Sequence, residues 1–234
     1  MSILEQRIGR PIANISFAMM QGYIRSMQRR GVGMLHTARP FSFYRKVFYQ
    51  GKSEAEVLFR LREKRIVDIG CGYTPYATNS MFRACHDAGI EFYGVDPLIE
   101  EDQKIGIRER LLARATGGSA RFDTKAPGLE RAISTTAQDL PFADGSVDEI
   151  LCSYLLFVWI EDEQVLSDIL QEFLRVLKPG GQAKIYPLFE WRYLRFKNPQ
   201  LKDLLRKFDI QQTFVHGGTD FRVSPSMLTV LTKH

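Results

Sequence analysis

Two carboxylates and a pair of glycines are the residues of this 234-residue sequence whose spacing first suggests chemistry. The run IVDIGCG at 66–72 places Asp68 near the end of an apolar stretch, directly before Gly70 and Gly72. Asp96 closes a second apolar run, 24 residues after Gly72, where an acid can accept hydrogen bonds from both hydroxyls of a ribose. Because glycine lets a backbone come close to a ligand, the pattern indicates a nucleoside site.

The same turn argues against a dinucleotide or a bound phosphate. A dinucleotide fingerprint has a third small residue three positions after the second glycine, and here that position is Pro75. We expect Thr74 to cap a helix and Pro75 to be its first residue, which leaves one amide fewer for a phosphate. The GK[ST] ending of a phosphate loop is also absent from the sequence.

Short apolar runs alternate with helical patterns from Arg65 onward, which is typical of an α/β fold with a parallel sheet covered on both faces. We expect seven strands, at 66–69, 92–95, 132–135, 149–153, 182–186, 210–216 and 227–231. We expect helices near 54–63, 76–88, 102–115, 161–177 and 199–207. Ligands of such sheets bind at the carboxyl ends of the strands. The turns after Asp68, Val95, Thr135 and Ser153 should therefore face one cleft.

The N-terminal segment differs from the rest in pattern and charge, and we interpret residues 1–64 as a helical lid or cover on an α/β domain at 65–234. Residues 1–65 carry 13 Lys and Arg against 4 Asp and Glu. This is either a solvated basic face or a surface for an acidic substrate, a carrier protein or nucleic acid. Apolar residues at helical spacing predict an amphipathic helix that packs on its own domain: Ile8, Ile12, Ile15, Met19, Tyr23, Ile24 and Met27.

Composition excludes several other classes of protein. With 44% hydrophobic and 25% charged residues the chain matches an ordinary globular protein. Cys71, Cys85 and Cys152 form neither a disulfide framework nor a metal motif, so we expect buried thiols and no bound metal. No run reaches the ~18 apolar residues that a membrane span needs, and no cleavage site follows the N-terminus. We expect a cytoplasmic location.

Two further stretches carry a family resemblance. TTAQDLPFADGSVDEILCSYLLFVW at 135–159 and EFLRVLKPGGQAKIY at 172–186, together with the glycine turn and Asp96, resemble the class I S-adenosylmethionine-dependent methyltransferase superfamily. The likeness is strongest to its small-molecule branch, and it covers roughly residues 65–187. It implies a Rossmann-like, seven-stranded, mostly parallel sheet, with S-adenosylmethionine as cosubstrate or sole substrate.

The resemblance also implies roles for particular residues. Asp68, Gly70 and Gly72 would carry the methionine portion of the cofactor, and Asp96 its ribose. Adenine would meet the loop that contains Ala137, Gln138 and Asp139, while Ser153 and Tyr154 would lie beside the sulfonium. Thr136 stands where the family usually has an acid that binds the adenine amino group, so Asp139 or Gln138 would replace it. The motif LKPGG at 177–181 is expected to be structural, with Gly180 and Gly181 ending a helix and turning the chain into the fifth strand.

Aromatic side chains are the main candidates for the reaction pocket. S-adenosylmethionine already contains the electrophile, so an enzyme of this class mainly aligns a nucleophile and excludes water. Rings attract a sulfonium through cation–π contacts, and we select Tyr154, Tyr76 and Tyr186 as the catalytic-site candidates. Arg39, Arg45 and Lys46 are candidates for binding a carboxylate. His36 and His216 are candidate bases, although a lone histidine is more often structural.

Several functions remain open at this stage. By the same resemblance, the superfamily's enzymes that methylate nucleic acids would carry [DNS]PP[YF] or a Pro-Cys pair after the fourth strand. Neither motif is present, which argues against nucleic acid as a substrate. We expect methyl transfer to a small molecule in a closed aromatic pocket. One alternative is a cyclase or lyase in which the cofactor's own amine displaces the sulfur, which gives azetidine-2-carboxylate and methylthioadenosine. The other is a non-catalytic cofactor-binding module. The sequence does not indicate the oligomeric state.

Overall fold

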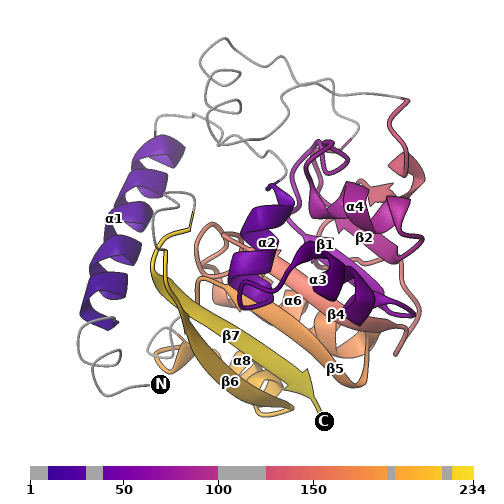
Figure 1. The fold of residues 1–234 in the computed structure, drawn as a ribbon. Coiled ribbons are helices and arrows are strands. Elements are labelled where there is room, and N and C mark those ends of the chain that lie inside the picture. The colour runs from indigo at the N-terminus through magenta and orange to yellow at the C-terminus, as the bar shows by residue number, and fades with distance from the viewer. Residues whose placement is uncertain (1–9, 30–38, 100–124, 189–192, 218–222) are drawn as a thin grey trace.

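The structure is a computed structural model that describes residues 10–29, 39–99, 125–188, 193–217 and 223–234. Its centre is a seven-stranded sheet in the order β3-β2-β1-β4-β5-β7-β6 (Figure 1). The strands β1 to β5 pair in parallel, and β7 is antiparallel to both of its neighbours. The strands are β1 Arg65–Ile69, β2 Glu91–Val95, β3 Ala132–Ile133, β4 Val147–Ser153, β5 Leu177–Tyr186, β6 Phe208–Val215 and β7 Ser226–Lys233.

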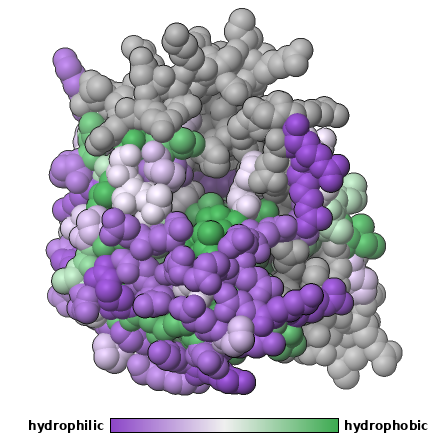
Figure 2. Space-filling view, turned by 180° about the vertical axis from the view of Figure 1, so that it is seen from behind, coloured by the Kyte–Doolittle hydropathy of each residue, from purple (hydrophilic) through white to green (hydrophobic). Residues whose placement is uncertain are grey.

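Helices cover both faces of this sheet, as the sequence predicts. One face carries α2, α3 and α4, while α6 and α8 lie behind the sheet in Figure 1. Figure 2 shows the molecule from behind, with hydrophobic atoms gathered near the centre of a mostly hydrophilic surface. The helices are α1 Arg10–Arg29, α2 Phe41–Phe48, α3 Glu54–Leu61, α4 Met81–Asp87, α6 Glu163–Val176 and α8 Pro199–Leu205, with a short 3-10 helix, η2, at Leu129–Arg131.

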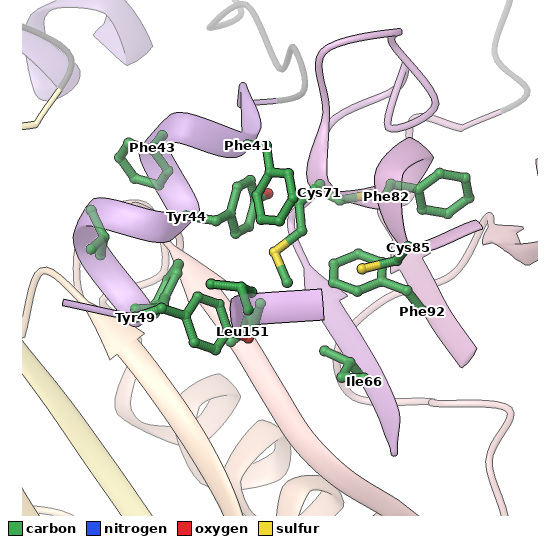
Figure 3. Packing of buried hydrophobic residues seen from close by; sticks show 14 of the residues in the cluster. Phe41, Phe43, Tyr44, Tyr49, Ile66, Cys71, Phe82, Cys85, Phe92 and Leu151 are labelled. Atoms are coloured by element: carbon green, nitrogen blue, oxygen red, sulfur yellow. The ribbon is translucent and has the colours of Figure 1, made fainter. Parts of the chain in front are cut away.

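Two hydrophobic clusters hold the layers together. The cluster under α6 and α8 has the aliphatic character expected for strands that are buried on both faces. The cluster under α2, α3 and α4 is rich in aromatic residues, and Figure 3 shows Tyr44 and Tyr49 directed from α2 toward the strands. Because residues of α2 and α3 share a core with β1 and β4, the predicted cover packs tightly on the sheet. Whether it is a separate unit stays a prediction.

The helix predicted to begin at Thr74 begins later. The N-cap of α4 is Ser80, whose Oγ accepts a hydrogen bond from the Arg83 amide at 3.1 Å. Residues 74–79 instead form turns that meet the start of α2, where Phe41, its first residue, donates its amide to the Asn79 carbonyl at 2.7 Å. A contact distant in sequence therefore overrides the local helix signal of a threonine followed by proline.

The glycines of LKPGG also have a different position from the predicted one. Helix α6 ends at Val176, and strand β5 is already paired with β4 at Leu177. Gly180 has a φ of 75° and lies in an irregularity of the β4–β5 pairing, since Val147 pairs with Leu177 while Glu149 pairs with Gln182. The motif is structural, as expected, but it forms a bulge inside the strand and does not terminate the helix.

The predicted N-terminal helix is present as α1, but the two members of the predicted stripe whose side chains are described, Ile15 and Met19, are exposed. The other five members lie outside the described side chains. Phe17 and Gln21 are buried, whereas Ile15 and Met19 are 62% and 72% exposed. The helix is attached in part by polar contacts, since Arg25 pairs with Glu161 at 2.9 Å. Apolar spacing alone did not identify the packed face. The predicted helix at 102–115 and the candidate His36 lie outside the described residues.

Within the described ranges, the helices are all too short or too polar to cross a membrane. The three cysteines are free and buried, as predicted.

Candidate active site

The glycine turn after β1 is held against the end of β2. Gly70 and Gly72 have φ values of 72° and 85°, which are unfavourable for residues with a side chain. The Gly70 amide donates to the Val95 carbonyl at 2.8 Å. A Cβ atom at Gly94 would lie 2.9 Å from Cys71 Sγ, so the close approach of strand and turn requires a glycine at that position too.

Asp96 is fixed in place by the same turn. Its side chain is 3% exposed, and its two oxygens accept hydrogen bonds from the amides of Gly72 at 3.1 Å and Leu98 at 2.9 Å. Each carboxylate oxygen has further acceptor capacity. The Asp96 carboxylate is therefore oriented by the backbone and can still accept hydroxyl donors from a ligand.

A cavity of about 280 Å³ opens beside Asp96, at the carboxyl ends of β1 to β4. Its volume is near the lower limit for small-molecule sites. The structure thus brings together the turns that the sequence predicts to share a cleft. The lining residues are Ile69, Gly70, Val95, Asp96, Pro97, Leu98, Thr135, Thr136, Ala137, Gln138, Leu155 and Ile160.

Only some residues of the predicted adenine loop line the cavity. Ala137 and Gln138 line the cavity, and so does Thr136, the residue at the position of the family's acid. Asp139 is exposed and does not belong to the lining, and its amide donates to the Thr136 carbonyl at 3.3 Å. Gln138 is thus better placed than Asp139 to reach a ligand.

Asp68 is the most unusual acid of the site. It is 3% exposed, and its Oδ2 accepts a hydrogen bond from the hydroxyl of Tyr44 on α2. Its other oxygen, Oδ1, is buried and has no hydrogen-bond partner among the described residues. Burial raises the pKa of Asp68 to about 7, although the hydrogen bond from Tyr44 acts in the opposite direction. An unpartnered buried carboxylate oxygen is costly, which points to a ligand that completes it.

Next to Asp68 almost no free volume remains. A cavity of about 10 Å³, lined by Arg39, Tyr44, Asp68 and Cys71 among others, is too small for more than a water molecule. Helix α2 therefore fills the space beside Asp68, whereas the side of Asp96 is open. The site has an open half and a closed half.

Three rings, which we call the aromatic group, lie at the edge of the closed half: Phe43, Tyr154 and Tyr186. The Tyr154 and Tyr186 ring centroids are 5.5 Å apart at 89°, and Phe43 lies 6.1 and 6.3 Å from them. Tyr154 follows β4 with a φ of 56°, an uncommon backbone conformation for a residue with a side chain. Two of the three predicted catalytic tyrosines thus make direct ring contact.

The remaining candidates have varied positions. Tyr76 is buried in the same hydrophobic cluster, and Ser153 is the last residue of β4. Arg45 donates to the Lys52 carbonyl at 2.7 Å and Lys46 to the Gly217 carbonyl, so neither is directed at the cavity lining by these bonds. The ring of His216 packs at 4.7 Å against Phe214. Among the basic candidates that the structure describes, Arg39 alone lines the small cavity.

A buried polar network beneath the site was not predicted. Lys184 Nζ and the Tyr49 hydroxyl each donate to Glu149 Oε1 at 2.7 Å, and all three residues are buried. Burial lowers the pKa of Lys184, while the Glu149 carboxylate favours its charged form. Glu149 and Lys184 both interrupt apolar strands. Opposite charges inside neighbouring buried strands were the signal that could have revealed this pair.

A second hollow lies at the other end of the sheet. It measures about 590 Å³ and is lined by charged residues, including Arg65, Glu91, Asp148 and Lys178. These residues pair with each other, Arg65 with Glu91 and Lys178 with Asp148, both at 2.8 Å. It lies away from the carboxyl ends where ligands of such sheets bind, so we assign it no site. No group of three or more potential metal ligands occurs among the residues with described positions.

Comparison with known proteins agrees with this geometry. The family model described as "Methyltransferase domain" matches residues 67–185, about half of the chain. None of the curated proteins matches significantly.

The similar solved structures are distant. A SAM-dependent methyltransferase from Methanosarcina mazei is 18% identical, covering 76% of this chain and 96% of its own, with a TM-score of 0.42. A SAM-dependent methyltransferase from Thermotoga maritima is also 18% identical, covering 93% of this chain and 100% of its own, with a TM-score of 0.38. A geranyl diphosphate C-methyltransferase from Streptomyces coelicolor is 17% identical, covering 77% of each chain, with a TM-score of 0.39. Likeness at this level carries no argument about the chemistry of this chain.

Proposed function

This chain belongs to the methyltransferase-domain family, within the class I S-adenosylmethionine-dependent superfamily, and we propose that it methylates a small molecule. The observation that carries the proposal is the pairing of an open cavity at Asp96 with an unpartnered buried oxygen on Asp68. The two carboxylates suit the two polar parts of S-adenosylmethionine, its ribose and its amino acid end.

The described residues indicate an orientation for such a ligand, whose amino acid end needs more room beside Asp68 than the 10 Å³ void provides. Asp96 would accept hydrogen bonds from the ribose, with adenine in the cavity beside Ala137 and Gln138. The amino group would complete Asp68 Oδ1, which places the methionine portion along Gly70 and Gly72. When bound, the cofactor supplies an electrophilic methyl group. The task of the protein is then to orient the reacting atoms and to exclude water.

The surroundings of the aromatic group favour a small acceptor. Tyr186 donates its hydroxyl to the Ser224 carbonyl, and the Tyr154 hydroxyl accepts from the Ser224 amide at 3.3 Å. These contacts join the ends of β4 and β5 to the segment that precedes β7, while α2 covers the same rings from the other side. A pocket bounded so closely suits a small molecule better than nucleic acid. The cytoplasmic location stays a prediction.

A second candidate reaction is favoured by Asp68 itself. In this reaction the amine nitrogen of S-adenosylmethionine bonds to its own γ-carbon, the bond from that carbon to sulfur breaks, and methylthioadenosine leaves with the electron pair. The ammonium form must first lose a proton, and Asp68 is a buried acceptor whose pKa is raised to about 7. The same groups therefore support a cyclase that requires no second substrate.

One incubation separates the two reactions. Purified protein is mixed with S-adenosylmethionine alone, and the nucleoside products are identified by chromatography and mass spectrometry. We expect no turnover without an acceptor, and S-adenosylhomocysteine once a suitable small molecule is added. Methylthioadenosine and azetidine-2-carboxylate in equal amounts, without any acceptor, would contradict methyl transfer and establish the cyclase. If the cofactor binds but no compound gives a product, the chain is a binding module.

Asp96→Ala tests the cofactor site under either reaction. Hydrogen bonds to a charged group are worth about 1.5–3 kcal/mol, so the variant should bind S-adenosylhomocysteine roughly 10- to 100-fold more weakly. Asp139→Ala is the matched control, since this acid is exposed and lies outside the cavity lining. Unchanged affinity in a folded Asp96→Ala protein would remove Asp96 from the site.

A further inference from the structure

Arg39 has an unusual partner for a cation inside a ligand site. Its guanidinium carbon lies 4.7 Å from the centroid of the Tyr154 ring and 5.1 Å from that of Phe43. Both distances are within the ~6 Å range of a cation–π contact. Phe43 is fully buried and Tyr154 is 8% exposed, so these ring faces are largely shielded from water. The aromatic group thus already holds one positive charge.

These rings do not line the 280 Å³ cavity themselves, but Tyr154 directly precedes a residue that does. Leu155, which follows Tyr154, lines the 280 Å³ cavity, and its side chain lies 3.0 Å from where a Cβ atom of Gly70 would be. Arg39 also lines the small cavity beside Asp68. A ligand with its ribose at Asp96 and its amine at Asp68 would therefore carry its sulfur past the rings that Arg39 now contacts.

We propose that Arg39 is a displaceable cation that holds the place of the sulfonium, and that it makes the site distinguish S-adenosylmethionine from S-adenosylhomocysteine. The inference rests on the proposed function. Two positive charges in contact repel each other strongly when they are shielded from water, so Arg39 must leave the rings before a sulfonium occupies them. The thioether of S-adenosylhomocysteine has no charge and imposes no such displacement.

Arg39 thereby favours the binding of S-adenosylhomocysteine over that of S-adenosylmethionine, and its removal should abolish this contribution. In the wild-type protein, S-adenosylmethionine loses affinity because the contact between Arg39 and the rings must be broken. S-adenosylhomocysteine binds without that loss. Arg39 is therefore a specificity-determining residue, and its effect appears in the ratio of the two dissociation constants more clearly than in either one.

The test is a calorimetric titration of both ligands into wild-type, Arg39→Met and Arg39→Lys proteins, with product analysis to correct for turnover. We expect Arg39→Met to lower the ratio of the S-adenosylmethionine to the S-adenosylhomocysteine dissociation constant by roughly 2- to 30-fold, the range of cation–π contacts from exposed to desolvated ones. Arg39→Lys keeps the charge and should keep a ratio near that of the wild type. If Arg39→Met does not fold, Arg39→Gln takes its place.

Arg62→Met is the matched control. Arg62 also lies over a ring, 5.4 Å from the centroid of Phe59, but that ring is 71% exposed on the surface. The ratio should not change in this variant.

Two results would overturn the inference. If Arg39→Met weakens both ligands equally, the guanidinium binds a group that they share, such as the carboxylate. If it changes neither affinity, Arg39 only packs against the rings. A failure of the proposed function has a different signature, because neither ligand would then bind to folded wild-type protein.

Discussion

Two buried carboxylates lie beneath the same short helix, and they differ in how many hydrogen-bond and ion-pair partners the protein supplies. Asp68 on β1 and Glu149 on β4 point to the face of the sheet that α2 covers, and each accepts a hydrogen bond from a tyrosine of that segment. Glu149 also has a lysine at 2.7 Å, whereas one oxygen of Asp68 has no partner among the described residues. Glu149 thus has its partners within the protein, whereas one oxygen of Asp68 is left for a ligand.

This difference separates structural from functional charge in one hydrophobic cluster. Glu149, Lys184 and Tyr49 fix the end of α2 to the middle of the sheet, since Tyr49 is the C-cap of that helix. Tyr44, one turn earlier, reaches the edge of the sheet where the cofactor is proposed to bind. We expect perturbation of the first acid to change stability and perturbation of the second to change ligand binding and pH dependence.

The largest expected effect is the loss of unfolding free energy when Glu149 is deprived of its lysine partner. Lys184→Met leaves Glu149 buried with Tyr49 but without its cation, and removal of one partner of a buried pair costs about 3–5 kcal/mol of unfolding free energy. Urea denaturation measures it. The double variant Glu149→Met with Lys184→Met removes both charges and should recover most of the loss. A cost below about 1 kcal/mol for the single variant would mean that the pair behaves like an exposed one, and the comparison would fail.

The next effect is a pH dependence that belongs to Asp68. Burial raises its pKa in the folded chain from 3.8 to about 7. Between these values the folded chain binds a proton that the unfolded chain has released, so stability falls as pH rises through this window. The Asp68→Asn variant has no carboxyl group at this position, so it does not undergo this fall in stability. Its stability relative to the wild type should rise by about 2–4 kcal/mol from pH 4 to pH 7.

Urea denaturation at several pH values checks this prediction, with Asp139→Asn as the control at an exposed acid. Parallel pH profiles for wild-type and Asp68→Asn proteins would show that Asp68 is ionised in both states. That result would contradict the assignment of Asp68 as the buried acid that is available to a ligand.

The smallest effects compare the two tyrosines. Tyr49→Phe removes a donor to the charged pair and should cost about 1.5–3 kcal/mol. At pH 6 Asp68 is largely protonated, so Tyr44→Phe removes a bond to a neutral group and should cost about 0.5–1.5 kcal/mol. Both variants are compared by urea denaturation at pH 6. The reverse order of the two costs would contradict the assignment of Glu149 as structural and Asp68 as functional.

The sequence predicted which turns meet at the open cavity, because the signals for these turns are local. One residue separates Gly70 from Gly72, and Asp96 directly follows the adjacent strand β2, so a strand pattern and a turn suffice to place them. The seven strands were predicted on the same basis. Seven strands that are parallel except for the pairings of β7 agree with the mostly parallel sheet that the resemblance implied. The order of the strands was not predicted.

The closed half depends on contacts that no local pattern contains. Tyr44 meets Asp68 across 24 residues and Tyr49 meets Glu149 across 100. The segment FSFYRKVFY at 41–49 is dense in aromatic and basic residues, but only packing determines which ring meets which acid. Arg39 was a candidate for a carboxylate, and the structure places it over two rings. Tertiary contacts also shifted the start of α4 from Thr74 to Ser80.

The central claim is that the crevice at the carboxyl ends of β1, β2 and β4 takes an S-adenosyl ligand. Calorimetric titration of S-adenosylhomocysteine into folded wild-type protein tests it most directly. We predict saturable binding of one molecule per chain. No heat of binding at any accessible temperature, from protein whose circular dichroism and cooperative unfolding show that it is folded, would contradict the account.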